Sequence, residues 1–231
     1  MRIRHIVFVF SLWGLSVSVM GQDVNQVDSK GLRQGKWTAS YPNGTKRYEG
    51  QFEEGRCVGT FTYYDEDGRL KATNEFDTSG EKALNKTYSS NGRLIATGYY
   101  LNRKKDGEWR YYTEKTGKLM LTEEYGNDKL NGWVRIYNPD TERVAEETQY
   151  VDGKREGQGK QYFDTGLLLS EFQYHNDKLN GPAKTYYPNT VLKEEGNYLD
   201  GSRNGIWKTY NEDGELIHTD TYGGMDAMPL F

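Results

Sequence analysis

The sequence predicts an all-β fold: an elongated, single-layer antiparallel meander of about eight stacked β-hairpin repeats, twisted into a trough. Three observations support this prediction. A glycine recurs every 24 or 25 residues, and each interval closes on an aromatic residue. The composition also suits strands joined by tight turns, since hydrophobic residues make up only 35% of the chain while 19 Tyr and 27 Gly are present. Fixed-period similarity of this kind is typical of repeat architectures.

The six letters NDKLNG occur twice, at residues 127–132 and 176–181, and their final glycine serves as a marker of the repeat. The marker position is occupied by Gly35, Gly59, Gly107, Gly132, Gly157, Gly181 and Gly205, with Ala83 where one glycine is missing. The repeat region therefore spans residues 31–222 in eight units.

Further positions recur in register with the marker. The Tyr column, five residues past it, consists of Tyr64, Tyr88, Tyr112, Tyr137, Tyr162, Tyr186 and Tyr210. The Trp column, two residues past it, contains Trp37, Trp109 and Trp207, with Phe61 in the second unit. The closing aromatics are Phe52, Phe76, Tyr100, Tyr125, Tyr150, Tyr174, Tyr198 and Tyr222. We treat the Tyr column and the Trp column as the two candidate binding surfaces.

Each unit fits a β-hairpin, as residues 207–222 illustrate. A three-residue loop at 212–214 suits a type I turn followed by a left-handed residue, which glycine supplies without steric cost. That loop sets Tyr210 opposite Leu216. Simple alternation then places Tyr210, Leu216 and Tyr222 on one face and the Trp column on the other. Polar links rich in Gly and Asn turn the chain back into the next unit, which gives about sixteen strands.

The N-terminus has the layout of a secretory signal peptide. Arg2 and Arg4 precede an apolar run, and small residues stand before Gln22. The alternative is a membrane anchor, but the run is shorter than the roughly 20 residues that span a bilayer. We expect residues 1–21 to be removed on export to the periplasm, the outer surface or the medium. Residues 22–30 would form a short linker and 223–231 a C-terminal tail.

Charge argues against a nucleic-acid binder. Cleavage would remove two of the 30 basic residues and none of the 34 acidic ones, changing the net charge from −4 to −6. A nucleic-acid partner requires a basic stripe. The single cysteine, Cys57, excludes an intramolecular disulfide and is expected to be an inert apolar residue.

Two charged columns also follow the repeat. Glu147, Glu171 and Glu195 recur three residues before the closing aromatic. Three interpretations are open: an acidic rail for a basic partner, a weak cation site, or a solvated face. The basic column is Arg110, Arg135, Lys160, Lys184 and Lys208. The expected pairing puts Lys184 opposite Glu194, which favours a ladder of exposed ion pairs; phosphate or lipid-headgroup binding is the alternative.

No arrangement of residues indicates an enzyme, a metal site or a cofactor. His175 and His218 lie in different repeats without convergent ligands, and no nucleophilic triad is recognisable. A glycoside hydrolase based on the Glu column would need two carboxylates flanking a sugar in a cleft, and an open sheet provides no such enclosure.

Residues 199–222 and 107–120 resemble the variant form of the membrane-occupation-and-recognition-nexus (MORN) repeat, often found in YwqK-type antitoxins. The resemblance covers about residues 31–222. It implies contact with another protein, sometimes with membrane lipid, and no catalysis; the antitoxin relationship implies a toxin partner. The segment 107–120 also looks like the aromatic repeats of choline- or glucan-binding wall modules, although the Trp position holds Asn85, Gly159 and Ala183 in three units.

The sequence thus predicts an exported, non-enzymatic scaffold that binds a protein along a concave, Tyr-rich face. The alternative is a module that binds a surface glycan or a lipid headgroup through the Trp column or the basic column.

Overall fold

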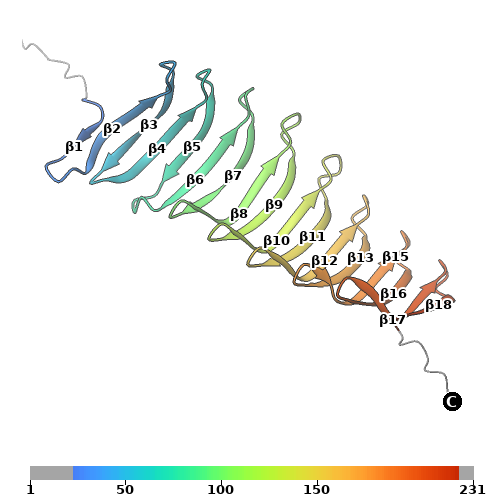
Figure 1. Cartoon of the computed structure of the whole chain (residues 1–231). Coiled ribbons are helices and arrows are strands. Elements are labelled where there is room, and N and C mark those ends of the chain that lie inside the picture. Colours follow the sequence, from blue (N-terminus) through green and yellow to red (C-terminus); the bar gives the residue numbers. More distant parts are fainter. Residues whose placement is uncertain (1–22, 224–231) are drawn as a thin grey trace, which may run out of the picture.

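The computed structural model describes residues 23–223, which form 18 antiparallel strands in one open sheet without a helix (Figure 1). The predicted all-β meander is confirmed. The expected signal peptide 1–21 and nearly all of the expected tail lie outside the described residues.

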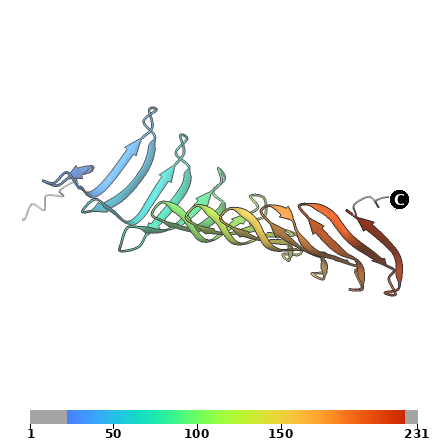
Figure 2. The same cartoon turned by 60° about the horizontal axis from the view of Figure 1, so that its bottom comes forward.

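The first nine strands are β1 (Gln26–Val27), β2 (Arg33–Ser40), β3 (Lys46–Glu53), β4 (Arg56–Tyr64), β5 (Leu70–Phe76), β6 (Lys82–Tyr88), β7 (Leu94–Leu101), β8 (Lys104–Tyr112) and β9 (Leu119–Gly126). The remaining strands are β10 (Lys129–Tyr137), β11 (Val144–Val151), β12 (Lys154–Tyr162), β13 (Leu168–His175), β14 (Lys178–Leu179), β15 (Gly181–Tyr186), β16 (Leu192–Leu199), β17 (Ser202–Tyr210) and β18 (Leu216–Tyr222). Hairpin loops line one long edge of the sheet and links between hairpins line the other, while the sheet coils along its length (Figures 1 and 2).

The hairpin loops follow the predicted turn. In the last hairpin the Asn211 N–H donates to the Glu215 carbonyl at 2.9 Å, and Gly214 has a φ of +83°. Tyr210 pairs with Leu216, as predicted. The two units of 25 residues carry their extra residue in this loop, because Thr113 bonds to Lys118 and Asn138 to Arg143, one position further than elsewhere.

All links between hairpins except the one between β5 and β6 are two-residue turns with both central residues at positive φ. In the two NDKLNG segments these are Asn127–Asp128, with φ of 53° and 68°, and Asn176–Asp177, with φ of 47° and 66°. Such type I′ turns match the twist of the flanking strands, and Asn and Asp tolerate them better than most residues. The repeated six letters therefore encode a repeated turn.

Two differences raise the strand number above sixteen. β1 forms within the expected linker and covers part of the β2 edge, pairing Gln26 with Gln34 and Val27 with Arg33. The strand that would run from Lys178 to Tyr186 is broken into β14 and β15 beside Pro182, which has no N–H to donate to the ladder.

The expected division of residues between the faces is wrong for the closing aromatics. Each hairpin slips register near its loop: Thr209 pairs with His218 and Tyr210 with Leu216, which leaves Ile217 without a partner. This bulge reverses the alternation along β18. Tyr222 consequently lies on the Trp face, the face that carries the Trp column, with its ring centroid 6.4 Å from that of Trp207.

The same effect shifts the expected charge pairing by one residue. Lys184 pairs with Glu195, and Glu194 pairs with Thr185, because the register slips between Thr185 and Tyr186. The predicted partner of Lys184 was therefore wrong, although an acidic residue still faces it.

The packed layer of the sheet consists of rings laid over small residues. At the marker, three consecutive residues lie opposite a single residue of the preceding strand. The ring at the Trp position therefore lies directly above that single residue. A Cβ added to Gly98 would lie 2.3 Å from the Trp109 ring, and one added to Gly196 would lie 2.2 Å from Trp207. Closing aromatics pack edge-on against these rings, for example Tyr198 on Trp207 at 5.1 Å.

Candidate functional site

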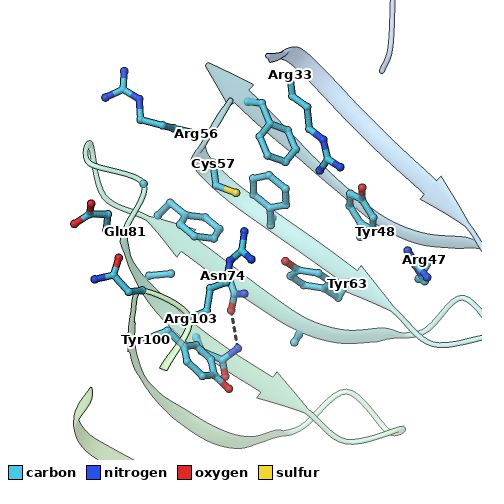
Figure 3. Close-up of a pocket in the computed structure, with 18 of the residues that line it drawn as sticks. Arg33, Arg47, Tyr48, Arg56, Cys57, Tyr63, Asn74, Glu81, Tyr100 and Arg103 are labelled. Carbon is cyan, nitrogen blue, oxygen red and sulfur yellow. Dashed lines mark hydrogen bonds between the residues drawn. The ribbon is translucent and has the colours of Figure 1, made fainter. Parts of the chain in front are cut away.

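A hollow of about 1090 Å³ opens on the Trp face over β2–β7, in the N-terminal part of the array (Figure 3). We call it the N-terminal hollow. It does not lie along the Tyr column, where the sequence predicted the binding surface; only Tyr64 of that column borders it.

The hollow forms where the third unit departs from the repeat. Asn85 occupies the Trp position and is only 5% exposed, and its amide donates to the Asn74 side chain at 2.7 Å. An asparagine fills far less space than an indole. The link 77–81 is also longer than the other links, and it bends over the sheet until a Cβ on Gly80 would lie 2.8 Å from the Cys57 carbonyl. The small residue leaves space, and the long link forms a wall.

The floor of the hollow is aromatic. Phe52, Phe61 and Phe76 pack edge-to-face with centroid separations of 5.2 and 5.3 Å. Phe61 is only 3% exposed, so the floor is closely packed. Tyr48 and Tyr63, half-buried, extend it toward the hairpin loops, with ring centroids 6.1 Å apart.

The rim is strongly basic. Arg33, Arg47, Arg56, Lys71 and Arg103 line the hollow, whereas Glu81 is its one acidic lining residue. These residues come from separate elements, including the β7–β8 turn that carries Arg103. Arg33 lies over the Trp37 and Phe52 rings at 4.6 and 5.1 Å, and Arg47 over Tyr48 at 5.8 Å. Stacking holds a guanidinium plane while leaving its N–H edges available.

Three of these arginines lack an acceptor. Residues 23–223 contain eleven arginines. Eight donate side-chain hydrogen bonds to a carboxylate or a backbone carbonyl: Arg56, Arg69, Arg93, Arg110, Arg135, Arg143, Arg155 and Arg203. In the described part of the chain Arg33, Arg47 and Arg103 have no such bond, and all three line the hollow.

Burial sets the protonation of the neutral groups in the hollow. It raises the pKa of the Tyr63 and Tyr100 hydroxyls and that of the Cys57 thiol. Arg103 and Arg33 act on the thiol pKa in the opposite direction, but more weakly. The tyrosines therefore remain hydrogen-bond donors, and Cys57 remains a neutral thiol rather than a reactive thiolate.

The predicted Tyr column has a structural role in four units. The hydroxyls of Tyr64, Tyr162, Tyr186 and Tyr210 each donate to a glutamate fifteen residues earlier, on the preceding hairpin, at 2.7–2.9 Å. Three of the acceptors are the predicted Glu column, and the fourth is Glu49. In the other three units the residue fifteen positions before Tyr88, Tyr112 and Tyr137 is a threonine instead of a glutamate, and all seven tyrosines are half-buried.

The predicted Trp column is largely enclosed. Trp109 and Trp207 are each 3% exposed, and their indole N–H groups donate to the Tyr99 and Asn197 carbonyls. Trp37, in the first unit, is half-buried and offers more surface. Beside these rings runs a column that sequence reasoning missed, a cation two residues before the marker: Arg33, Lys105, Arg155 and Arg203 lie over aromatic rings at 3.9–4.6 Å. This column was detectable in the sequence, because each of its members stands two residues before the marker glycine.

The two predicted charged columns alternate across neighbouring strands. Arg135, Glu147, Lys160, Glu171, Lys184, Glu195 and Lys208 are successive cross-strand partners. Arg135 and Glu147 approach to 3.2 Å. Arg110, the remaining predicted basic residue, pairs with Glu108. The register of the expected ladder is therefore present, but among these cross-strand partners within residues 23–223 only Arg135 and Glu147 come within salt-bridge distance.

Within residues 23–223, no three His, Cys, Asp or Glu side chains converge as metal ligands. The same residues include no helix of the length and hydrophobicity needed to cross a membrane.

The match to a known repeat family falls on three segments of the hairpin array. The MORN repeat variant family matches residues 33–54, 179–200 and 203–222. No curated protein matches the chain. Among solved structures, TarM is 15% identical over 42% of this chain, with a TM-score of 0.31. The Photorhabdus luminescens Tc holotoxin pore is 12% identical over 80% of it, with a TM-score of 0.19. The matches span 18% and 14% of those two proteins.

Proposed function

We propose that this chain is an exported, non-catalytic β-repeat scaffold that binds a protein partner through the N-terminal hollow. The observation that carries this proposal is the hollow itself, a closely packed aromatic floor under half-buried tyrosines at the one unit where the packed layer is interrupted by Asn85 and a long link. Aromatic residues and arginine are the residues enriched at protein interfaces.

The proposal changes the expected binding face but keeps the expected partner class. The Tyr column is engaged by carboxylates of its own chain in four units, whereas Tyr48, Tyr63 and Tyr100 in the hollow are half-buried and face solvent space. Under the resemblance to YwqK-type antitoxins, the partner would be a toxin.

A second candidate function is binding of a surface glycan or a lipid headgroup. The basic rim of the hollow favours it, since a phosphate or a uronate is an acceptor for guanidinium groups. Binding to purified envelope that survives protease treatment would support this candidate over a protein partner.

Capture from native envelope and secreted fractions tests the proposal. The full chain should retain a stoichiometric protein, and the variant Tyr63→Ala should lose most of it. Tyr137→Ala is the matched control, because Tyr137 is a half-buried tyrosine on the other face. Capture that is equal for both variants, or absent from every fraction, contradicts binding in the hollow.

Export has its own test. Intact-mass measurement of the protein from its native cells should find a chain that begins at Gln22. A protein that retains Met1 and stays in the cytoplasmic fraction contradicts export without affecting the binding proposal.

A further inference from the structure

We infer that the N-terminal hollow receives an acidic, extended peptide segment of the partner, with carboxylates on the arginine rim and an apolar side chain against the half-buried rings of Tyr48, Tyr63 and Phe76. This inference deepens the proposed function and depends on it. It specifies the chemistry of the segment, which neither the fold nor the family resemblance supplies.

The charge of the hollow is opposite to that of the molecule. Five basic side chains and one acidic side chain line it, in a chain whose net charge is −4. Arg33 lies at the start of β2 and Arg103 in the β7–β8 turn, and both line the same hollow. Figure 3 shows Arg33 and Arg47 along one side of the floor and Arg103 on the other.

Several side chains that line the hollow are hydrogen-bond donors without an acceptor in the described part of the chain. Within residues 23–223 the side chains of Arg33, Arg47 and Arg103 donate to no carboxylate or carbonyl, while the eight other described arginines all do. Tyr48 and Tyr100, which also line the hollow, contribute hydroxyl groups. Guanidinium groups form two parallel hydrogen bonds with a carboxylate, so these three exposed side chains suit anionic acceptors.

The size and lining favour a peptide over a compact anion. At about 1090 Å³ the hollow is at or above the roughly 300–1,000 Å³ of small-molecule pockets, and it lies open along the sheet. Its Phe floor offers nothing to a bare phosphate.

The rest of the molecule disfavours extended polyanions. Residues 127–223 carry 11 basic and 17 acidic side chains. An anionic vesicle or a long acidic polysaccharide would lie along the whole array and meet this negative half. A short segment contacts the basic hollow alone, where a partner charge is attracted over a Debye length of about 8–10 Å.

The probe is a pair of fluorescein-labelled decapeptides in which Asp and Glu, or in the second peptide Asn and Gln, alternate with Phe and Leu. Fluorescence anisotropy with the full chain should show the acidic peptide binding at least about tenfold more tightly than its amide counterpart. Raising the salt concentration should weaken the acidic peptide selectively.

Variants locate the binding. Arg47→Gln and Arg103→Gln should each weaken the acidic peptide by about tenfold, since each removes a charge-assisted bond from an arginine without an internal partner. Arg110→Gln is the control, because Arg110 lies in the basic column away from the hollow and should leave binding unchanged. Circular dichroism verifies that all three variants keep the strand signal.

Three outcomes would overturn the inference. The first is equal affinity for the acidic and amide peptides, and the second is wild-type affinity of the Arg47 and Arg103 variants for the acidic peptide. The third is arginine-dependent binding of phosphatidylglycerol vesicles or oligogalacturonate without peptide binding. A native partner whose capture ignores both arginine variants but needs Tyr63 would overturn the acidic segment and leave the proposed function standing. Absence of any captured protein, with the acidic peptide still bound, would contradict the proposed function instead.

Discussion

At the scale of single residues, the size of one side chain decides what its cross-strand neighbour can be. Gly50, Gly98 and Gly196 lie under Phe61, Trp109 and Trp207, each with room for no Cβ. In the sixth unit the relation is inverted, because Gly159 takes the Trp position and Phe172 supplies the ring above it. In the sixth unit the ring missing from the Trp position is therefore replaced by Phe172. At Asn85 no ring replaces the missing indole, and the hollow remains.

This relation predicts a large effect from a single methyl group. Gly196→Ala places a Cβ about where the Trp207 ring lies, at 2.2 Å, and should destabilise the fold by about 1–3 kcal/mol through overpacking. Urea unfolding followed by Trp fluorescence measures it. The exposed neighbour Asn197 provides the control, since Asn197→Ala should stay within about 0.5 kcal/mol of wild type. A Gly196 variant as stable as this control would show that the ring moves freely.

The Tyr–Glu bonds predict a loss of stability in alkali. The pKa of Tyr162 and of Tyr186 is raised to about 12. Burial is the largest cause, and the hydrogen bond to a glutamate is the second. Because the folded state holds these protons more tightly than the unfolded chain, their contribution is complete below about pH 10 and is lost as the pH rises toward 12. Chemical unfolding at pH 9 and pH 11 should show the decline.

Tyrosine-to-phenylalanine variants test whether these two tyrosines cause the loss of stability in alkali. Tyr162→Phe and Tyr186→Phe should each flatten it and lower stability at pH 8 by about 1 kcal/mol. Tyr88→Phe serves as the control, because the residue fifteen positions before Tyr88 is Thr73 rather than a glutamate. An unchanged slope in the first two variants would mean that other groups cause the alkaline transition.

At the scale of the element, the period and the turn chemistry were predictable, whereas the faces were not. The three-residue loop before Glu215 and the pairing of Tyr210 with Leu216 follow from local letters and are confirmed. The face of Tyr222 and the partner of Lys184 were wrong, because alternation cannot detect the extra residue that each bulge inserts. The hollow was not predictable either, since it requires a long link to bend over the sheet toward Cys57 beside the gap that Asn85 leaves in the next strand.

The number of strands that a strained hairpin loop destabilises should depend on where that hairpin lies in the array. Gly214 and Gly117 have φ of +83° and +73°, so a valine at either position should cost roughly 1–2 kcal/mol. Each unit contacts mainly its neighbours, so Gly214→Val should loosen only β17 and β18, while Gly117→Val should separate the units on its two sides. Amide hydrogen exchange resolved along the sequence distinguishes them. Equal loss of protection over all strands in both variants would contradict a nearest-neighbour array.

At the scale of the whole molecule, the sheet has two ends and no closed core. The N-terminal edge is covered by β1 and by Asn25, whose amide accepts a bond from the Thr38 N–H at 2.8 Å. At the other end β18 is largely exposed, with Leu216 and Ile217 at 54% and 60%. Capping one terminal strand limits edge-to-edge pairing at that end. Between these ends stability is a sum of similar units and interfaces, which makes the length of the array adjustable.

Deletions test that adjustability. Removing residues 133–157 joins Gly132 to Gln158, two equivalent points of the repeat, and takes out one unit of 25 residues with its hairpin and link. The shortened chain should keep the strand signature in circular dichroism and melt cooperatively as a seven-unit array. It should also keep the acidic-peptide affinity of the intact chain, because β2–β7 are untouched. Removing only residues 133–144 deletes half a unit, reverses the direction in which the following strand must run and places polar residues on the Trp face, so the neighbouring units should unfold. If thermal melts find both deletions equally folded or equally unfolded, stability does not reside in the hairpin unit.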